Sequence, residues 1–364
     1  MKNKIAIASA FLAASSFSMG EIVINDFLSF EGFVDMSYVH TGTETDDQTE
    51  SDNSFAIDQV EVSWLFDFDP VTAQIDVQYE GGSSESDTNI EQAFVTYHME
   101  SLGGGAAITA GRYASMLGFE AFEPTGLYQY TTAYDINGAP VDSFNDLSII
   151  PGYAQGIKFT YETDTTFFGL SFQDEAFGNG SGEIRGDEEN RELDSTFAVE
   201  IAGAYYMDNG LSFFLGGAHE EGDGGFRNTW VINAYTTFET GAWIFAAEVN
   251  FGETDSGSFE FAGDRGTLGE DAIEEADALQ ALIMANFAYS DKASVTGRLS
   301  YIEFDSGITE LGHEYLKYTL AHGYAFTDNL LLVTEISAID GKRAPKNATE
   351  FDNFLVGAEL LFTF

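Results

Sequence analysis

The last nine residues, VGAELLFTF at positions 356–364, decide the fold of this chain. The apolar residues of this stretch recur at every second position: Val356, Ala358, Leu360, Phe362 and Phe364. Because successive side chains of a β-strand point to opposite faces, the pattern predicts a strand with one apolar and one wetter face. By itself the stretch is compatible with a membrane barrel and with the last buried strand of a soluble β-sandwich.

The aromatic ending resembles the terminal strand of Gram-negative outer-membrane β-barrels. That resemblance implies two partners for the chain, the lipid of the outer membrane and the barrel assembly machinery. It also implies that Phe362 and Phe364 form the signal that this machinery reads.

The composition favours the barrel over a bundle of transmembrane helices. The 364-residue chain is 44% hydrophobic and 15% aromatic, and it contains 38 Gly and only 5 Pro. No run approaches the roughly 20 apolar residues of a transmembrane helix, and the mean hydropathy is −0.10. Apolar residues that are frequent but never contiguous must alternate with polar ones, which is typical of barrel strands.

The first 20 residues have the pattern of a secretory signal peptide. Lys2 and Lys4 precede the apolar stretch 5–14, and small residues follow up to Gly20. We expect cleavage after Gly20, which leaves residues 21–364 as one barrel domain in the outer membrane. The absence of Cys excludes a lipoprotein anchor.

Alternating segments recur along the rest of the chain without a domain linker. Residues 57–68 and 73–79 are clear examples, joined by a tight turn at Asp69-Pro70. About 16 such segments predict an all-β fold, an antiparallel transmembrane barrel with short periplasmic turns and long extracellular loops. We expect long loops at 42–53, 175–194 and 257–275. Candidate residues for the interfacial aromatic girdles are Trp64, Tyr113, Tyr161, Trp243, Tyr289 and Tyr301.

The charge is extreme, with 61 acidic and 14 basic residues and a formal net charge of −47. A nucleic-acid partner is disfavoured, because binding phosphates needs a basic surface. An acidic surface concentrates cations near a pore mouth. Adaptation to a saline habitat is an equally good explanation of the charge, and the two are compatible.

The longest connection, residues 115–150, is too long for a passive loop. It mixes aromatic residues with five acids, Glu120, Glu123, Asp135, Asp142 and Asp146. It is the third long loop of the predicted barrel, and general porins with this strand count fold their third loop into the lumen as a constriction. The resemblance therefore implies that this acidic loop narrows the pore.

Four of the scarce basic residues are predicted to project into the lumen. Alternation places Lys158, Arg298 and Lys317 there, and Arg112 ends a strand at the base of the long loop. Cations that face an acidic loop would set up a transverse field, one way in which side chains confer ion selectivity. Alternatively, they pair with inward-facing acids and only neutralise the interior. Those acids include Glu61, Asp76, Glu200, Glu248 and Glu359.

A short motif resembles the OmpL-like family of β-barrel porins. It runs through Gly111-Arg112-Tyr113, Leu117-Gly118-Phe119-Glu120 and Pro124. In that family a Gly-Lys/Arg-aromatic strand end leads into a loop with Gly-aromatic-Glu, and this chain has Arg112 where many members carry Lys. The resemblance implies a pore but names no solute.

Enzyme, metal and cofactor motifs are not found. The five histidines form no His-x-x-x-His pair, and no Gly-x-Ser-x-Gly elbow occurs. We therefore expect a non-enzymatic porin without cofactor or metal, which lets small hydrophilic solutes and ions diffuse and prefers cations. The alternatives are a plugged structural or surface-interaction barrel, a substrate-specific channel, and a secreted polysaccharide-binding β-protein. Porins of this size are often homotrimers, although nothing in the sequence identifies a trimer face.

Overall fold

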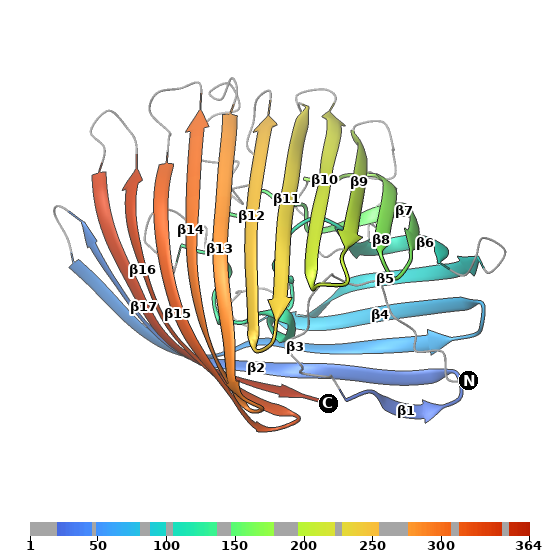
Figure 1. Ribbon diagram of the computed structural model, residues 1–364, viewed down its shortest axis with the longest axis horizontal. Helices are drawn as coiled ribbons and strands as arrows, with labels where there is room; N and C mark the ends of the chain where they lie inside the picture. Colours follow the sequence, from blue (N-terminus) through green and yellow to red (C-terminus); the bar gives the residue numbers. More distant parts are fainter. Residues whose placement is uncertain are drawn as a thin grey trace.

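The computed structural model describes residues 20–45, 49–80, 88–99, 105–136, 147–177, 196–222, 228–254, 276–306, 313–343 and 349–364 (Figure 1). Within these ranges the regular structure consists of β-strands and one short 3-10 helix, η2 (Pro124–Gly126). None of the helical structure described is long and apolar enough to cross a membrane. The predicted signal peptide lies almost entirely outside the described residues.

The strands are long, as a tilted membrane crossing requires. Their bounds are β1 (Ile22–Asn25), β2 (Leu28–Thr45), β3 (Thr49–Asp67), β4 (Val71–Glu80), β5 (Thr88–Met99), β6 (Ala106–Ala114), β7 (Tyr153–Glu162), β8 (Thr166–Gln173), β9 (Thr196–Tyr206), β10 (Leu211–Gly222), β11 (Thr229–Thr240), β12 (Trp243–Thr254), β13 (Ala276–Ser290), β14 (Ala293–Ser306), β15 (His313–Thr327), β16 (Leu330–Arg343) and β17 (Thr349–Thr363).

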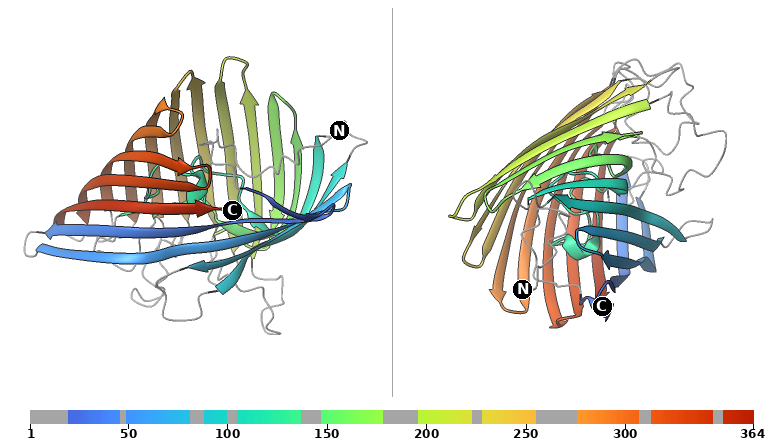
Figure 2. Two further views of the ribbon diagram at one scale, coloured as in Figure 1. Left: turned by 90° about the horizontal axis from the view of Figure 1, so that it is seen from below. Right: turned by 90° about the vertical axis from the view of Figure 1, so that its right-hand side faces the viewer.

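Strands β2 to β17 form a closed antiparallel ring of sixteen strands. Each pairs with its sequence neighbours, and β17 pairs with β2, so the C-terminal strands lie beside the N-terminal ones (Figure 2). At the seam, Gly32 and Phe364 exchange two backbone hydrogen bonds of 2.9 Å. Closure pairs β17 with β2, so that the ring has no unpaired terminal strand, as a lipid environment demands. The predicted sixteen-stranded barrel is therefore confirmed.

The short strand β1 lies outside this ring and was not expected from the sequence. It pairs with the beginning of β2, with Ile22 opposite Phe30. The edge of β2 is free there because β17 ends opposite Phe33. β1 thus continues this edge beyond the end of β17.

The prediction of a long loop at 42–53 is wrong. β2 and β3 are paired over its described residues, 42–45 and 49–53, with Gly42 opposite Ser51 and Glu44 opposite Thr49. A ladder needs only backbone groups, so it continues where the side chains are polar and the alternation has faded. The expected loops at 175–194 and 257–275 lie almost wholly outside the described residues.

The outer face of the ring is apolar, and much of the inner face is polar. On β12, Phe245, Val249 and Phe251 are 39%, 44% and 41% exposed on the outside. Glu248 and Asn250, which alternate with them, are buried on the inside. A barrel whose outer face exposes this much apolar surface matches a protein solvated by lipid.

Part of the inner wall is apolar, whereas the sequence pattern predicted a wetter inner face. On β13, Leu282 and Met284 are buried inside the barrel, while Ile283 faces outward. They belong to a buried apolar cluster that also contains Phe214 and Tyr235 of neighbouring strands. Water does not line this part of the barrel, because the long loop covers it, as described below.

Aromatic residues gather near the short turns, as expected for an interfacial girdle. The ring of Trp243 stacks on Phe287 with a centroid distance of 4.4 Å, and Tyr324 lies 5.2 Å from Phe326. Tyr113 does not belong to a girdle. It is 2% exposed, and its hydroxyl lies 2.9 Å from Ser171 Oγ inside the barrel.

Candidate pore and its constriction loop

The long loop leaves β6 at Ser115 and returns to β7 at Tyr153. It follows the β2–β3 and β4–β5 connections on the same side of the ring and is therefore the third loop of that side, as predicted. It turns inward, so that η2 lies within the ring of strands (Figure 2). We call residues 115–152 the inner loop; its described parts are 115–136 and 147–152.

Polar side chains of the wall, mostly acids, accept hydrogen bonds from the backbone of the inner loop. Met116 N–H donates to Glu200 Oε1 at 2.6 Å, and Phe119 N–H donates to Glu248 Oε1 at 2.7 Å. Gly118 N–H donates to Asn233 Oδ1 at 3.1 Å. A loop without a ladder needs such acceptors, because its backbone donors are shielded from water. These wall acids therefore hold the loop in place.

Two of the predicted basic residues also bind the inner loop directly. Arg298 of β14 forms an ion pair with Glu120 and donates to Thr132 O at 2.8 Å. Lys317 of β15 donates to Thr131 Oγ1 and to Asp135 O, each at 2.8 Å. The Glu120 carboxylate also accepts Gln129 Nε2 at 2.8 Å and Ala133 N–H at 2.6 Å. Both cations thus dock the loop instead of facing it across water.

Further contacts carry the loop across the barrel. Thr131 donates from its N–H and its hydroxyl to the two oxygens of Glu335 on β16, at 3.0 and 2.6 Å. The hydroxyl of Tyr130 lies 3.3 Å from Asp58 Oδ2 on β3. On the return path, Ile149 N–H donates to Gln280 Oε1 on β13 at 3.2 Å. The loop is therefore fixed to several strands around the barrel.

Apolar packing completes the docking. Leu117, Phe119, Tyr134 and Ile149 of the inner loop join the buried apolar cluster on the inner wall. The ring of Phe119 meets that of Tyr235 edge-on at 5.9 Å. The Tyr134 hydroxyl donates to Glu248 Oε2 at 3.0 Å. Burial, more than the nearby Glu248 charge, raises the pKa of this hydroxyl well above its usual value, so it stays a donor.

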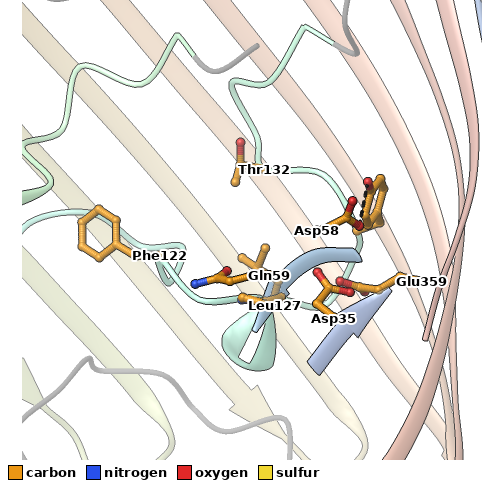
Figure 3. A pocket seen from close by; sticks show the side chains of 9 residues that line it. Asp35, Asp58, Gln59, Phe122, Leu127, Thr132 and Glu359 are labelled. Carbon is orange, nitrogen blue, oxygen red and sulfur yellow. Dashed lines mark hydrogen bonds between the residues drawn. The ribbon is translucent and has the colours of Figure 1, made fainter. Parts of the chain in front are cut away.

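An open cavity of about 300 Å³ remains between the inner loop and the wall. Its lining residues are Asp35, Asp58, Gln59, Phe122, Pro124, Leu127, Tyr130, Thr132 and Glu359. Figure 3 shows the carboxyl groups of Asp35 and Glu359 pointing toward each other, with Asp58 nearby and Phe122 on the other side. The lining contains three acids and no basic residue.

A β-bulge brings Asp58 into this cavity. Asp35 is opposite Gln59, but the next residue, Met36, is opposite Ile57, so Asp58 is the extra residue of β3. Strict alternation would place Asp58 and Gln59 on opposite faces. The bulge lets both line the cavity, the re-aiming of side chains for which bulges are known.

The other predicted site residues make contacts away from Arg298 and Lys317. Arg112 is buried, and its Nε donates to Glu91 O at 2.7 Å. The Lys158 ammonium lies 4.4 Å from the centre of the Tyr113 ring and 3.4 Å from Ala114 O. Glu123 is held by the Tyr153 hydroxyl and Gln59 Nε2 at 2.8 and 2.9 Å. Asp142 and Asp146 lie outside the described residues.

The sequence reasoning missed the cavity acids Asp35 and Asp58. The alternation around Asp35 and Glu359 is readable, but nothing local shows that β17 closes on β2 and brings these two residues together. For Asp58 the alternation itself is misleading because of the bulge. The break in alternation at Ala56-Ile57-Asp58-Gln59, two apolar residues followed by two polar ones, is the one signal that could have found it.

A closed sixteen-stranded barrel with an apolar outer face and its third loop folded inside is the architecture of an outer-membrane porin. The family comparison agrees. The chain belongs to the family described as Putative beta-barrel porin-2, OmpL-like, whose model matches residues 28–364. It is therefore an outer-membrane porin, and family and fold indicate a channel rather than an enzyme. No curated protein sequence matches the chain.

Solved structures of outer-membrane proteins share the fold at low sequence identity. The outer membrane channel DcaP of Acinetobacter baumannii has a TM-score of 0.61 and 12% identity, over 93% of this chain and 97% of that one. The anion-selective porin from Comamonas acidovorans has a TM-score of 0.59 and 12% identity, over 92% of this chain and 99% of that one. OmpT of Vibrio cholerae has a TM-score of 0.58 and 12% identity, over 94% of this chain and 100% of that one. At such identities the likeness shows the fold alone.

Proposed function

We propose that this porin lets small hydrophilic solutes and ions diffuse passively and prefers cations. The observation that carries the proposal is the open cavity beside the inner loop, lined by Asp35, Asp58 and Glu359 and by no basic residue. Carboxylates that line a narrow passage between low-dielectric walls attract cations and repel anions.

The positions of the basic residues support the same sign of selectivity. Arg298 and Lys317 are taken up by contacts with the inner loop, and Arg112 donates to a strand carbonyl. Lys158 lies against the Tyr113 ring. We therefore propose that these four residues anchor the loop and the wall, and that they do not form the opposing wall of a transverse field.

The inner loop is proposed as the constriction. Glu120 acts in it as a docking residue, through Arg298 and Ala133. Glu123 and Asp135 complete the described acids of the loop, and Asp142 and Asp146 keep their predicted place in the constriction. Removing the carboxylates of all five is expected to weaken cation selectivity.

The test is the reversal potential of the refolded mature protein in a planar bilayer under a KCl gradient. The wild type is expected to be cation-selective. The variant D35N/D58N/E359Q should shift the permeability ratio of K⁺ to Cl⁻ toward one. A matched control, D208N/D291N/D328N, removes the same charge from the short turns and should retain the wild-type ratio. Anion selectivity of the wild type, or equal shifts in both variants, would contradict the proposal.

A plugged barrel is the second candidate function. It is favoured by the many contacts of the inner loop, which reach β9, β12, β14, β15 and β16 as well as β3. In that case the acidic outer loops would be the working surface. This candidate would be supported if protein whose heat-dependent gel mobility shows that it is folded gave no conductance.

The remaining proposals concern biogenesis and assembly. We propose that residues 1–20 are cleaved on export and that the assembly machinery reads Phe362 and Phe364. A homotrimer is proposed by analogy, since a trimer form is described for OmpT of Vibrio cholerae. Mass spectrometry of the purified protein tests the cleavage site, and light scattering in detergent tests the subunit number.

A further inference from the structure

Three glutamates from separate parts of the chain meet at the inner wall near η2. They are Glu61 of β3, Glu91 of β5 and Glu123 of the inner loop. One carboxylate oxygen from each lies within 4.8 Å of the others. We call these three residues the glutamate trio; it lies beside the open cavity, with Gln59 common to both.

A second β-bulge builds the trio. Asp76 is opposite Gln92, but the next residue of β4, Val77, is opposite Ile90, so Glu91 is the extra residue of β5. Alternation would place Glu91 on the lipid side, together with Val95 and Tyr97, which are exposed. Instead it is buried inside the barrel, and bulges that re-aim a side chain are typical of functional positions.

Two members of the trio have carboxylate oxygens that no described donor reaches. Glu61 and Glu91 are each 5% exposed, and Oε2 of each has no hydrogen-bond partner among the described residues. A buried anionic oxygen without a partner is costly, so such groups are normally paired or bind a metal. Nearby Asp76 shows the contrast, because its carboxylate accepts three bonds from Gln74 and Gln92.

The third member is prepared to act as a ligand. Each oxygen of Glu123 accepts one bond, from the Tyr153 hydroxyl and from Gln59 Nε2. A carboxylate has about four lone-pair sites, so both oxygens keep free lone pairs. Outer hydrogen bonds of this kind orient carboxylate ligands in metal sites.

The local charge also fits a divalent cation. Arg112 approaches the trio, with Nε bonded to Glu91 O and the guanidinium 5.9 Å from the centre of the Tyr153 ring. When all three carboxyl groups are ionised, as they would be around a bound cation, their charge and that of the guanidinium sum to minus two, which a divalent ion neutralises. All-oxygen ligands suit Ca²⁺, whose Ca–O distances of about 2.3–2.6 Å allow ligand oxygens nearly 5 Å apart.

We propose that the glutamate trio binds one divalent cation of the Ca²⁺ type. The ion joins β3 and β5 to the inner loop at Glu123, the residue before η2. Arg298 and Lys317 hold the loop at Glu120 and at residues 131–135. The cation would fix the loop at Glu123, which neither of these basic residues contacts. This inference does not depend on the ion selectivity of the pore.

The test is equilibrium binding of radioactive Ca²⁺ to the refolded full-length mature chain in detergent, at 0.1 M KCl to screen the acidic surface. Tb³⁺ luminescence excited through tyrosine is a second readout, because Tyr153 contacts Glu123. The wild type is expected to have one site that binds Ca²⁺ at least tenfold more tightly than the surface carboxylates do. The variant E61Q/E91Q should lose this site.

A matched control removes the same charge from another lumen pair. D35N/E359Q is expected to keep the tight site, because neither residue belongs to the trio. E123Q, in the half-buried loop position, provides a second variant in case E61Q/E91Q does not fold, and should weaken Ca²⁺ binding at least tenfold. Equal Ca²⁺ binding by the wild type and both trio variants, or no site tighter than the surface ions, would overturn the proposal.

Discussion

The ion pair between Glu120 and Arg298 gives the sharpest test of how the inner loop is held. The side chains are 12% and 0% exposed, so water screens the pair little. The change E120Q keeps the shape but leaves the Arg298 charge buried without its anion. Breaking a buried pair in this way costs about 3–5 kcal/mol. Since about 1.4 kcal/mol corresponds to a factor of ten, the detached loop should become at least roughly 100-fold more populated.

The assay is hydrogen exchange followed by mass spectrometry on the folded protein in detergent. Peptides covering residues 115–136 should exchange roughly 100-fold faster in E120Q. In E120Q/R298M neither charge remains, so the exchange rate should return toward the wild-type value. E303Q, which changes an exposed glutamate on the same strand as Arg298, should have no effect.

Two results would refute this reasoning. One is wild-type exchange in E120Q, which would mean that the apolar packing alone holds the loop. The other concerns E120Q/R298M. If its effect on exchange equals the sum of the effects of E120Q and R298M measured alone, the two side chains are not coupled.

Three further predictions test the barrel and its loop. Ile283, which is 58% exposed on the outer face, should tolerate Lys poorly; I283K is expected to lose about 2–4 kcal/mol of stability, measured by urea unfolding in lipid vesicles. At the seam, a Cβ on Gly32 would meet Glu61 O and the Phe364 ring, so G32V should fold slowly and lose heat-dependent gel mobility, whereas a wild-type mobility would contradict the described closure. The change K317M removes the ammonium that holds Thr131 and Asp135; larger current fluctuations in single channels are expected, and quiet channels would show that Lys317 does not anchor the loop.

The sequence by itself determined the barrel and the position of its inner loop. The alternation at Val356–Phe364 and elsewhere is local information with a period of two, and lipid outside with water inside enforces it on nearly every strand. It therefore fixed the strand count and the inward direction of Arg298 and Lys317. It failed at Leu282 and Met284, where a folded-in loop replaces water as the neighbour.

Only the tertiary structure decided which side chains meet. Asp35 and Glu359 come together because the barrel closes, and Glu61, Glu91 and Glu123 meet because a bulge and an inward loop bring them together. Such contacts depend on register, closure and loop path, which link residues far apart in the chain. A bulge even reverses the face that local alternation assigns to Asp58 and Glu91. The strands could therefore be read from neighbouring residues, whereas the sites needed the paired sheet.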